Sequence, residues 1–119
     1  IVMDLKEVMS KHSFAVLGDT VNKEKYAYKI KEGLKEKGYT VYAVGKEIQS
    51  LNDIDGDIDI VDLCIHPAKG LKLLQECQKS YQCIVIQPGA SDEVLISYLQ
   101  QHNIPYLDGC LLVGLKLYA

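Results

Sequence analysis

Residues 14–28 constrain the fold of this chain more than any other stretch. They begin with an apolar, strand-forming run that ends at Leu17, and Gly18 then permits a tight turn. A helical pattern with basic residues at its start follows the turn. A buried strand that leads through a glycine turn into a helix is the first half of a βαβ unit. The stretch therefore predicts a parallel sheet covered by helices.

The rest of the chain repeats this alternation. Further strands are predicted at residues 40–44, 60–65, 83–86 and 104–107, and helices at residues 23–37, 69–79 and 91–102, the last capped by Ser91. Residues 4–11 read as a short helical lead-in, and residues 110–118 as a tail. The continuous apolar run CIVI is typical of a central strand covered on both faces. We predict a single α/β domain over residues 1–119, with a doubly wound, five-stranded parallel sheet and helices on both faces.

Composition excludes several classes of protein. The 119 residues are 48% hydrophobic and 24% charged, as expected for one soluble domain with a real core. The net charge of −3 offers no basic surface for nucleic acid, and no apolar run approaches the ~20 residues of a membrane span. Residues 1–11 lack the features of a signal peptide, and the four cysteines show no CxxC spacing. We expect a cytoplasmic domain with reduced thiols that binds neither nucleic acid nor membrane.

The predicted strands all end in turns of glycine, proline or polar residues. In an open parallel sheet the ligand crevice lies at the carboxyl ends of the strands, where the strand order reverses. The residues at these ends are Gly18 to Thr20, Gly45 and Lys46, His66 and Pro67, Gln87 to Gly89, and Asp108 to Cys110. One crevice lined by these turns is therefore predicted.

The first of these turns has features of a phosphate site. A phosphate there would meet backbone N–H groups, the positive end of a helix dipole and the ammonium of Lys23 or Lys25. Thr20 and Lys23 stand where a full G-x-G-x-x-G fingerprint has glycines, so the match is partial. All thirteen basic residues are lysine, so an anion must be held by ammonium groups and amides, without guanidinium forks. A turn that only connects strand and helix is the alternative.

The end of the second predicted strand bears on the kind of nucleotide. Proteins that bind NAD usually carry an acidic residue there, which hydrogen-bonds the free ribose. This chain has Gly45 and Lys46 instead. An ammonium at that place favours a nucleotide with an extra phosphate, such as coenzyme A or NADP. A solvated surface lysine is again the alternative.

Taken together, these motifs resemble the small stand-alone CoA-binding proteins, whose Rossmann-like fold is related to the CoA-binding domain of the succinyl-CoA synthetase α subunit. The motifs that carry the resemblance, in order, are V-L-G-D-T, K-E-K-Y, D-I-V-D-L, H-P, Q-P-G and Asp108-Gly-Cys110, within residues 13–112. The resemblance implies a Rossmann-like fold and the binding of coenzyme A or an acyl-CoA in the crevice.

Carried over position by position, the resemblance implies a set of binding residues. Gly18 and Thr20 would form the phosphate turn, and Val44 would lie against the adenine. The full set is Gly18, Asp19, Thr20, Lys23, Lys25, Tyr26, Val44, Gly45, Lys46, His66, Pro67, Gln87, Pro88, Gly89 and Cys110. The chain departs from the family at Gly45-Lys46, where Asn-Pro is frequent, and at Asp19, where a small residue is common. An acid beside a diphosphate is unfavourable unless it points away.

Other candidate sites are weaker. The acidic residues at 53, 55, 57 and 59 lack the glycine and glutamate positions of a calcium loop, so they read as a solvated turn. His66 could act as a general base or hydrogen-bond a phosphate. Cys110 has no activating base in the sequence and reads as a structural thiol. No catalytic residue and no metal ligand is predicted.

Three functions stay open on the sequence alone. The preferred one is a non-catalytic module that binds coenzyme A or an acyl-CoA. The second is an NAD(P)-binding redox sensor or small oxidoreductase, although 119 residues leave no substrate domain. The third is an interaction subunit with a vestigial nucleotide site, which Asp19 and the absence of arginine favour. The expected partner is a small nucleotide ligand, and an open sheet edge also permits a homodimer.

Overall fold

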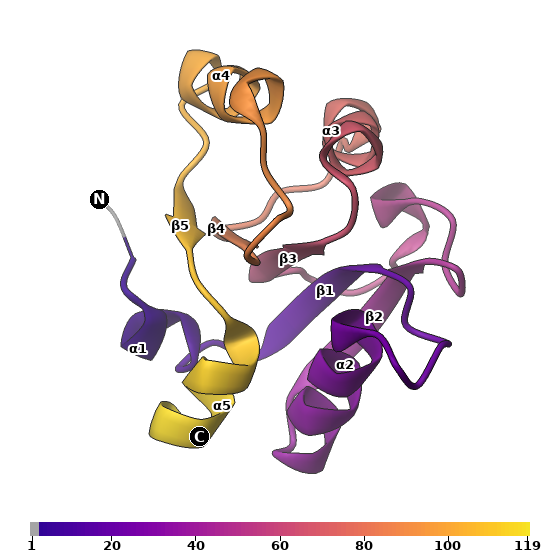
Figure 1. The fold of residues 1–119 in the computed structure, drawn as a ribbon, viewed down its shortest axis with the longest axis vertical. Coiled ribbons are helices and arrows are strands. Elements are labelled where there is room, and N and C mark those ends of the chain that lie inside the picture. Colours follow the sequence, from indigo (N-terminus) through magenta and orange to yellow (C-terminus); the bar gives the residue numbers. More distant parts are fainter. Residues whose placement is uncertain (1–2) are drawn as a thin grey trace.

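Five parallel strands form the sheet, in the order β2-β1-β3-β4-β5, in the computed structural model that describes residues 3–119 (Figure 1). The strands are β1 (Ser13–Gly18), β2 (Thr40–Gly45), β3 (Ile60–Cys64), β4 (Cys83–Ile86) and β5 (Tyr106–Asp108). The chain starts at β1, winds outward to β2, and then returns to β3 on the other side of β1. The order therefore reverses between β1 and β3, which confirms the doubly wound, Rossmann-like α/β fold.

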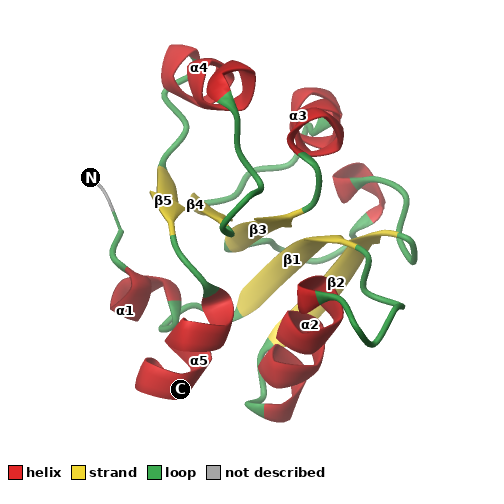
Figure 2. Ribbon diagram, in the orientation of Figure 1, coloured by secondary structure: helices red, strands yellow, loops and turns green. Residues whose placement is uncertain are grey.

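Helices cover both faces of this sheet, as predicted (Figure 2). They are α1 (Leu5–Val8), α2 (Tyr26–Glu36), α3 (Pro67–Glu76), α4 (Glu93–Gln101) and α5 (Leu111–Tyr118), with a short 3-10 helix η1 (Leu51–Asp53). The helices α1, α2 and α5 pack on one face, and α3, α4 and η1 on the other. No helix among residues 3–119 is long and apolar enough to cross a bilayer.

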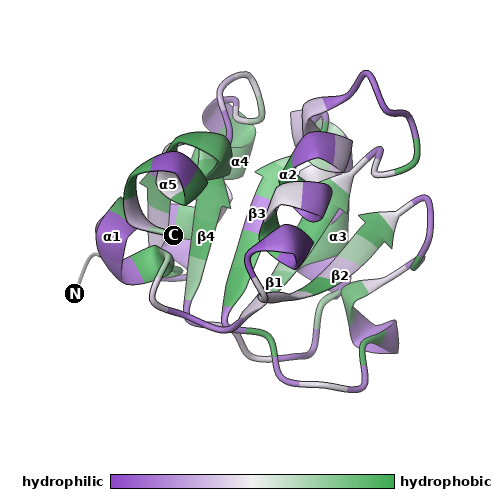
Figure 3. Ribbon diagram, turned by 90° about the horizontal axis from the view of Figure 1, so that it is seen from below, coloured by the Kyte–Doolittle hydropathy of each residue, from purple (hydrophilic) through white to green (hydrophobic). Residues whose placement is uncertain are grey.

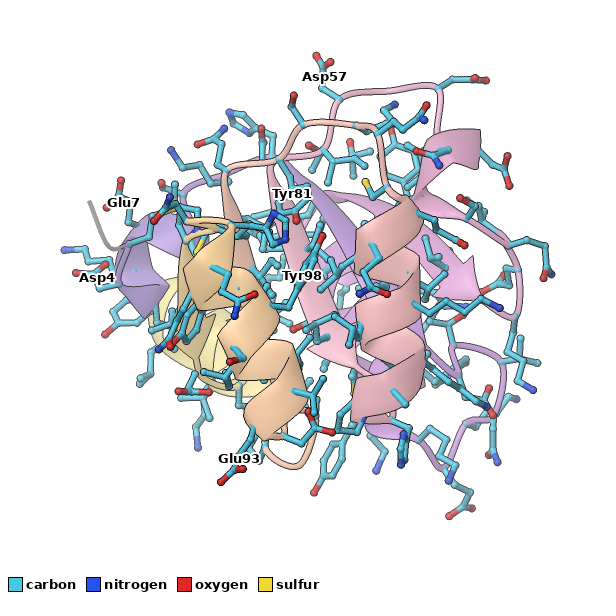
Figure 4. All side chains as sticks on the ribbon, turned by 90° about the horizontal axis from the view of Figure 1, so that it is seen from above. Asp4, Glu7, Asp57, Tyr81, Glu93 and Tyr98 are labelled. Carbon is cyan, nitrogen blue, oxygen red and sulfur yellow. The ribbon has the colours of Figure 1, made fainter. Side chains whose placement is uncertain are left out.

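The apolar strand residues divide into two cores, one on each face of the sheet. Leu17 and Leu63 point towards α3 and α4, whereas Phe14 and Val16 point towards α2 and α5. Every residue of β1 and β4 is buried, and the central strands are mostly green in Figure 3. Figure 4 shows Tyr81 and Tyr98 between α3 and α4, where both pack on the core that contains Leu17 and Leu63. Burial of each large apolar side chain contributes about 1.5–3 kcal/mol, so the two cores hold the strand ends in fixed positions.

Several predicted boundaries are corrected by the structure: the helix expected at 69–79 is α3 at Pro67–Glu76, and the strand expected at 104–107 is β5 at Tyr106–Asp108. The helix α2 begins at Tyr26 and not at residue 23, because Asn22 Oδ1 accepts the Glu24 N–H and holds this segment in a turn. Asp92 and not Ser91 caps α4, through a 2.9 Å hydrogen bond from the Leu95 N–H to Asp92 Oδ1. The predicted tail is the helix α5, since its leucines complete the core beside α2.

Asp62 is an exception within the core. It lies in the central strand β3, is fully buried, and neither carboxyl oxygen has a hydrogen-bond partner among residues 3–119. Burial raises the pKa of Asp62 well above its usual value, which favours the neutral acid. An unpartnered polar group of this kind lowers the stability of the fold.

Candidate functional site

A cavity of about 900 Å³ opens at the carboxyl ends of the strands, where the sequence predicted the crevice. It extends from the start of α2, past the ends of β1 and β2, to α3 and the turn after β4. Most of the predicted binding residues line it: Gly18, Asp19, Lys25, Tyr26, Gly45, Lys46, His66, Pro67, Gln87, Pro88 and Gly89. The fold thus gathers four separate turns of the chain around one space.

Four predicted residues do not line this cavity. The Thr20 hydroxyl is buried and donates a 2.7 Å hydrogen bond to Glu47, so the structure does not place it beside a phosphate. Val44 is fully buried in the core and is absent from the cavity wall. Lys23 lies exposed in the turn before α2, and Cys110 precedes the first residue of α5.

Two glycines form the floor of the cavity. Gly18 and Gly45 are paired in register at the ends of β1 and β2. A Cβ atom on Gly18 would overlap the Cys64 carbonyl oxygen and lie 2.9 Å from Ala27 Cβ. A Cβ on Gly45 would lie 2.8 Å from the Gly18 carbonyl oxygen. Because Gly18 lacks a side chain, the start of α2 packs directly against the end of β1, and because Gly45 lacks one, the ends of β1 and β2 lie close together.

The start of α2 is left without a cap. The N-cap residue is Lys25, whose side chain makes no capping hydrogen bond. Within residues 3–119, no acceptor is recorded for the N–H groups of Tyr26, Ala27 and Tyr28. These groups carry the partial positive charge of the helix dipole, and a lysine beside them is unfavourable on its own. An anion in the cavity would satisfy both the amides and the ammonium.

Asp19 folds back on its own loop. Its Oδ1 accepts the N–H groups of Asn22 at 3.0 Å and Val21 at 3.1 Å. These hydrogen bonds lower the pKa of Asp19, and the ammonium groups of Lys46 and Lys25 lower it further. The sequence predicted that the amides directly after β1 would hold an anion. Asp19 bonds the amides of Val21 and Asn22, which follow the predicted phosphate turn at Gly18 to Thr20, so the anion site at that turn stays a prediction. Further free donors lie at the start of α2.

The charge of the cavity wall differs in sign from that of the whole chain. Four lysines line it, against the two acids Asp19 and Glu76, whereas the chain has a net charge of −3. The lysines are Lys25, Lys46, Lys69 and Lys72, and no ion pair is recorded for any of them in the described part of the chain. The cavity therefore attracts anions although the protein is acidic.

Two polar side chains are held in orientations that offer donors to the cavity. His66 Nδ1 accepts the Ala68 N–H at 3.2 Å and caps α3, so the neutral ring carries its hydrogen on Nε2. Gln87 is buried, and its Oε1 accepts the Leu111 N–H at 2.8 Å. The amide NH2 of Gln87 is then the donor end. Both residues suit a ligand that presents carbonyl or phosphate oxygens.

Sequence reasoning missed nine of the lining residues: Ala27, Gln49, Cys64, Ile65, Lys69, Lys72, Leu73, Glu76 and Ala90. One signal was available, because Lys69, Lys72, Leu73 and Glu76 follow the spacing of a single helix face.

Burial raises the pKa of the Cys64 thiol to about 12, with Asp62 and Cys110 adding to the rise. Cys64 is therefore a protonated thiol and a poor nucleophile. No cluster of residues suited to a metal ion is found in residues 3–119.

The comparisons with known proteins agree with this geometry. The model of the CoA binding domain matches residues 12–116. No curated protein matches.

Solved structures show the same fold. A conserved hypothetical protein from Pyrococcus furiosus is 23% identical, with a TM-score of 0.75 over 87% of this chain and 98% of that one. A protein from Thermus thermophilus is 23% identical, with a TM-score of 0.79 over 98% and 100%. Prb, a protein redesigned for binding, is 20% identical, with a TM-score of 0.82 over 92% and 86%. Because the family model spans nearly the whole chain, this protein belongs to the family of CoA-binding domains.

Proposed function

We propose that this protein binds coenzyme A or an acyl-CoA without catalysing a reaction on it, in the cavity at the carboxyl ends of the strands. One observation carries the proposal: the uncapped start of α2 lies at a cavity whose lysines form no ion pair within residues 3–119. Membership of the CoA-binding family supports the same ligand.

The diphosphate of the coenzyme suits the start of α2. Its oxygens would accept hydrogen bonds from the free amides of Tyr26 and Ala27, above the floor made by Gly18. Lys25 and Lys46 supply ammonium groups on the same part of the wall. A hydrogen bond to a charged group contributes about 1.5–3 kcal/mol, so a few such bonds are enough for binding.

The pantetheine arm suits the part of the cavity beside β3 and β4. Its amide carbonyls are acceptors, and His66 and Gln87 offer donors there. The volume of about 900 Å³ lies at the upper end of the ~300–1,000 Å³ usual for ligand pockets. A long, flexible coenzyme therefore fits better than a small metabolite.

The chemistry of the wall favours binding over catalysis. Cys64 is the one cysteine among the lining residues, and its pKa of about 12 keeps it from attacking a thioester. Asp19 lies in the cavity, but its carboxylate is already bonded to two amides of its own loop. These groups lack the activated nucleophile that acyl transfer needs.

Isothermal titration with coenzyme A, 3′-dephospho-coenzyme A, NAD and NADP tests the proposal. We expect coenzyme A to bind more tightly than NAD, with an affinity that falls as salt is added. The variant Lys46→Glu should weaken coenzyme A binding by roughly tenfold, while Lys37→Glu, which lies outside the cavity, should not. Tighter binding of NADP would support a nicotinamide nucleotide instead. Failure of all four ligands to bind would indicate a vestigial site.

A further inference from the structure

We propose that α3 forms a second anion subsite in this cavity, in which Lys69 and Lys72 bind an anionic group of the ligand other than its diphosphate. The inference rests on the proposed function, because it assigns a further group of the same ligand. Neither lysine belongs to the binding residues that the family resemblance implies.

The position of the two lysines on α3 supports a shared subsite. Lys69 and Lys72 are three residues apart in the first two turns of α3, so they lie on one face of the helix, and both line the cavity. The helices α2 and α3 cover opposite faces of the sheet (Figure 1). Lys25 and the α3 lysines therefore approach the cavity from opposite sides of the sheet. Two separate anionic groups can be held at once.

The charges along α3 show where the anion would lie. Lys69 is the third residue of the helix, and the first turn contains no acidic residue. A cation in the first turn of a helix is unfavourable by itself, as at Lys25. In the described part of the chain, no hydrogen bond or ion pair offsets the charge of either lysine. Such a local conflict between residue and helix is typical of a binding site.

Neighbouring residues set the limits of the subsite. His66, at the cap of the same helix, has its Nδ1 occupied by the Ala68 N–H and so offers an Nε2–H donor at one end. Glu76 lines the cavity one turn beyond Lys72 and would repel an anion at the other end. The subsite therefore centres on the first two turns of α3.

The ligand class that fits is a coenzyme with two separated anionic groups. The first is the diphosphate at α2, and the second is an anionic oxygen group at α3. In coenzyme A compounds this second group is either the ribose 3′-phosphate or a carboxylate on the acyl chain. Both present the same chemistry to two ammonium groups, and ligand pairs that differ in one group distinguish them.

The test compares a double variant with a charge-matched control. In Lys69→Gln/Lys72→Gln the α3 subsite loses both charges. In Lys6→Gln/Lys37→Gln the net charge changes equally, and these lysines are exposed like Lys69 and Lys72 but lie outside the cavity. Isothermal titration measures the affinity ratio of coenzyme A to 3′-dephospho-coenzyme A, and of succinyl-CoA to butyryl-CoA, for each protein. Thermal unfolding checks that both variants are folded.

We expect one of the two ratios to fall by roughly tenfold in the α3 variant and to keep its wild-type value in the control. A fall in the first ratio identifies the 3′-phosphate, and a fall in the second identifies an acyl carboxylate. If both ratios keep their wild-type values in the α3 variant, the subsite is wrong while coenzyme A binding stands. If the wild-type protein binds none of the four ligands, the proposed function is wrong and the subsite falls with it.

Discussion

The junctions that lead from β1 into α2 and from β4 into α4 are built from the same parts but end differently. Each has a glycine in its turn, and both glycines line the cavity. At α4 the helix supplies its own cap, because Asp92 accepts the Leu95 N–H and Glu93 follows in the first turn. At α2 the cap position holds Lys25, and no side-chain cap is made.

The presence of a cap at α4 and its absence at α2 distinguish a helix start that serves the fold from one that, under the proposed function, binds a ligand. The start of α4 is capped within the protein, since Asp92 accepts the Leu95 N–H and the acidic Glu93 lies in the first turn. The helices α1 and α3 are likewise capped, by Asp4 and His66. The start of α2 has no side-chain cap within residues 3–119, and a bound anion would supply the missing acceptor. Under the proposed function, ligand binding and not folding accounts for the lysine at this position.

The largest expected effect is on stability, when Gly18 before α2 and Gly89 before α4 are each replaced by alanine. In Gly18→Ala the new methyl group would overlap the Cys64 carbonyl oxygen, so we expect the free energy of unfolding to fall by ~3 kcal/mol. In Gly89→Ala no atom lies within 4 Å of the new group, and only the φ of +86° opposes it, at about 1 kcal/mol. Urea unfolding measures both. If the two variants lost the same free energy of unfolding, the two junctions would be packed equally tightly.

The cap of α4 should matter for stability alone. Asp92→Ala removes the acceptor of the Leu95 N–H, and we expect a loss of about 1 kcal/mol in the free energy of unfolding. Asp92 does not line the cavity, so the affinity for coenzyme A should stay unchanged when measured by titration. A large loss of affinity in this variant would mean that α4 also takes part in binding.

The cap of α2 should respond in the opposite direction. Lys25→Asp provides the missing acceptor and removes an unfavourable cation, so the ligand-free protein should gain ~0.5–1 kcal/mol in the free energy of unfolding. The same change should weaken coenzyme A binding by about tenfold, because an acid replaces an ammonium beside the diphosphate. Lys25→Gln, which cannot supply a carboxylate cap, controls for loss of charge. A variant that loses stability and keeps its affinity would contradict the comparison.

The smallest expected effect is the pH dependence of the stability that Asp19 contributes. Its hydrogen bonds to Asn22 and Val21 lower its pKa below the usual 3.8, so it stabilises the folded state above that value. The contribution is lost as the pH falls through the lowered pKa. Asp19→Asn should therefore be less stable than the wild type at neutral pH, and the difference should shrink in acid. A difference that persists unchanged in acid would mean that the carboxylate does not hold this loop.

The sequence allowed the fold and the outline of the cavity to be predicted for a clear physical reason. Strands such as residues 83–86 are continuous apolar runs, and the turns after them contain the glycines and prolines that end a strand. In a doubly wound sheet all these ends meet at one edge, so residues as distant as Gly18 and Gln87 could be assigned to one site.

The errors concern features that only tertiary packing decides. Thr20 turns to Glu47, a residue 27 positions away that sequence spacing does not connect with it. Lys69 and Lys72 face the cavity because of the way α3 docks on the sheet, which the helical period alone does not reveal. The segment 110–118 was predicted as a tail, and residues 111–118 of it form the helix α5 because their leucines pack in the core beside α2.

The central claim is that the free amides at the start of α2 bind the diphosphate. Amide chemical shifts of ¹⁵N-labelled protein, followed during titration with coenzyme A, test it residue by residue. The account predicts large shifts for the amides of Tyr26, Ala27 and Tyr28, with little change at Glu93 and Leu95 in the first turn of α4. Saturable binding that leaves the three α2 amides unmoved would contradict it.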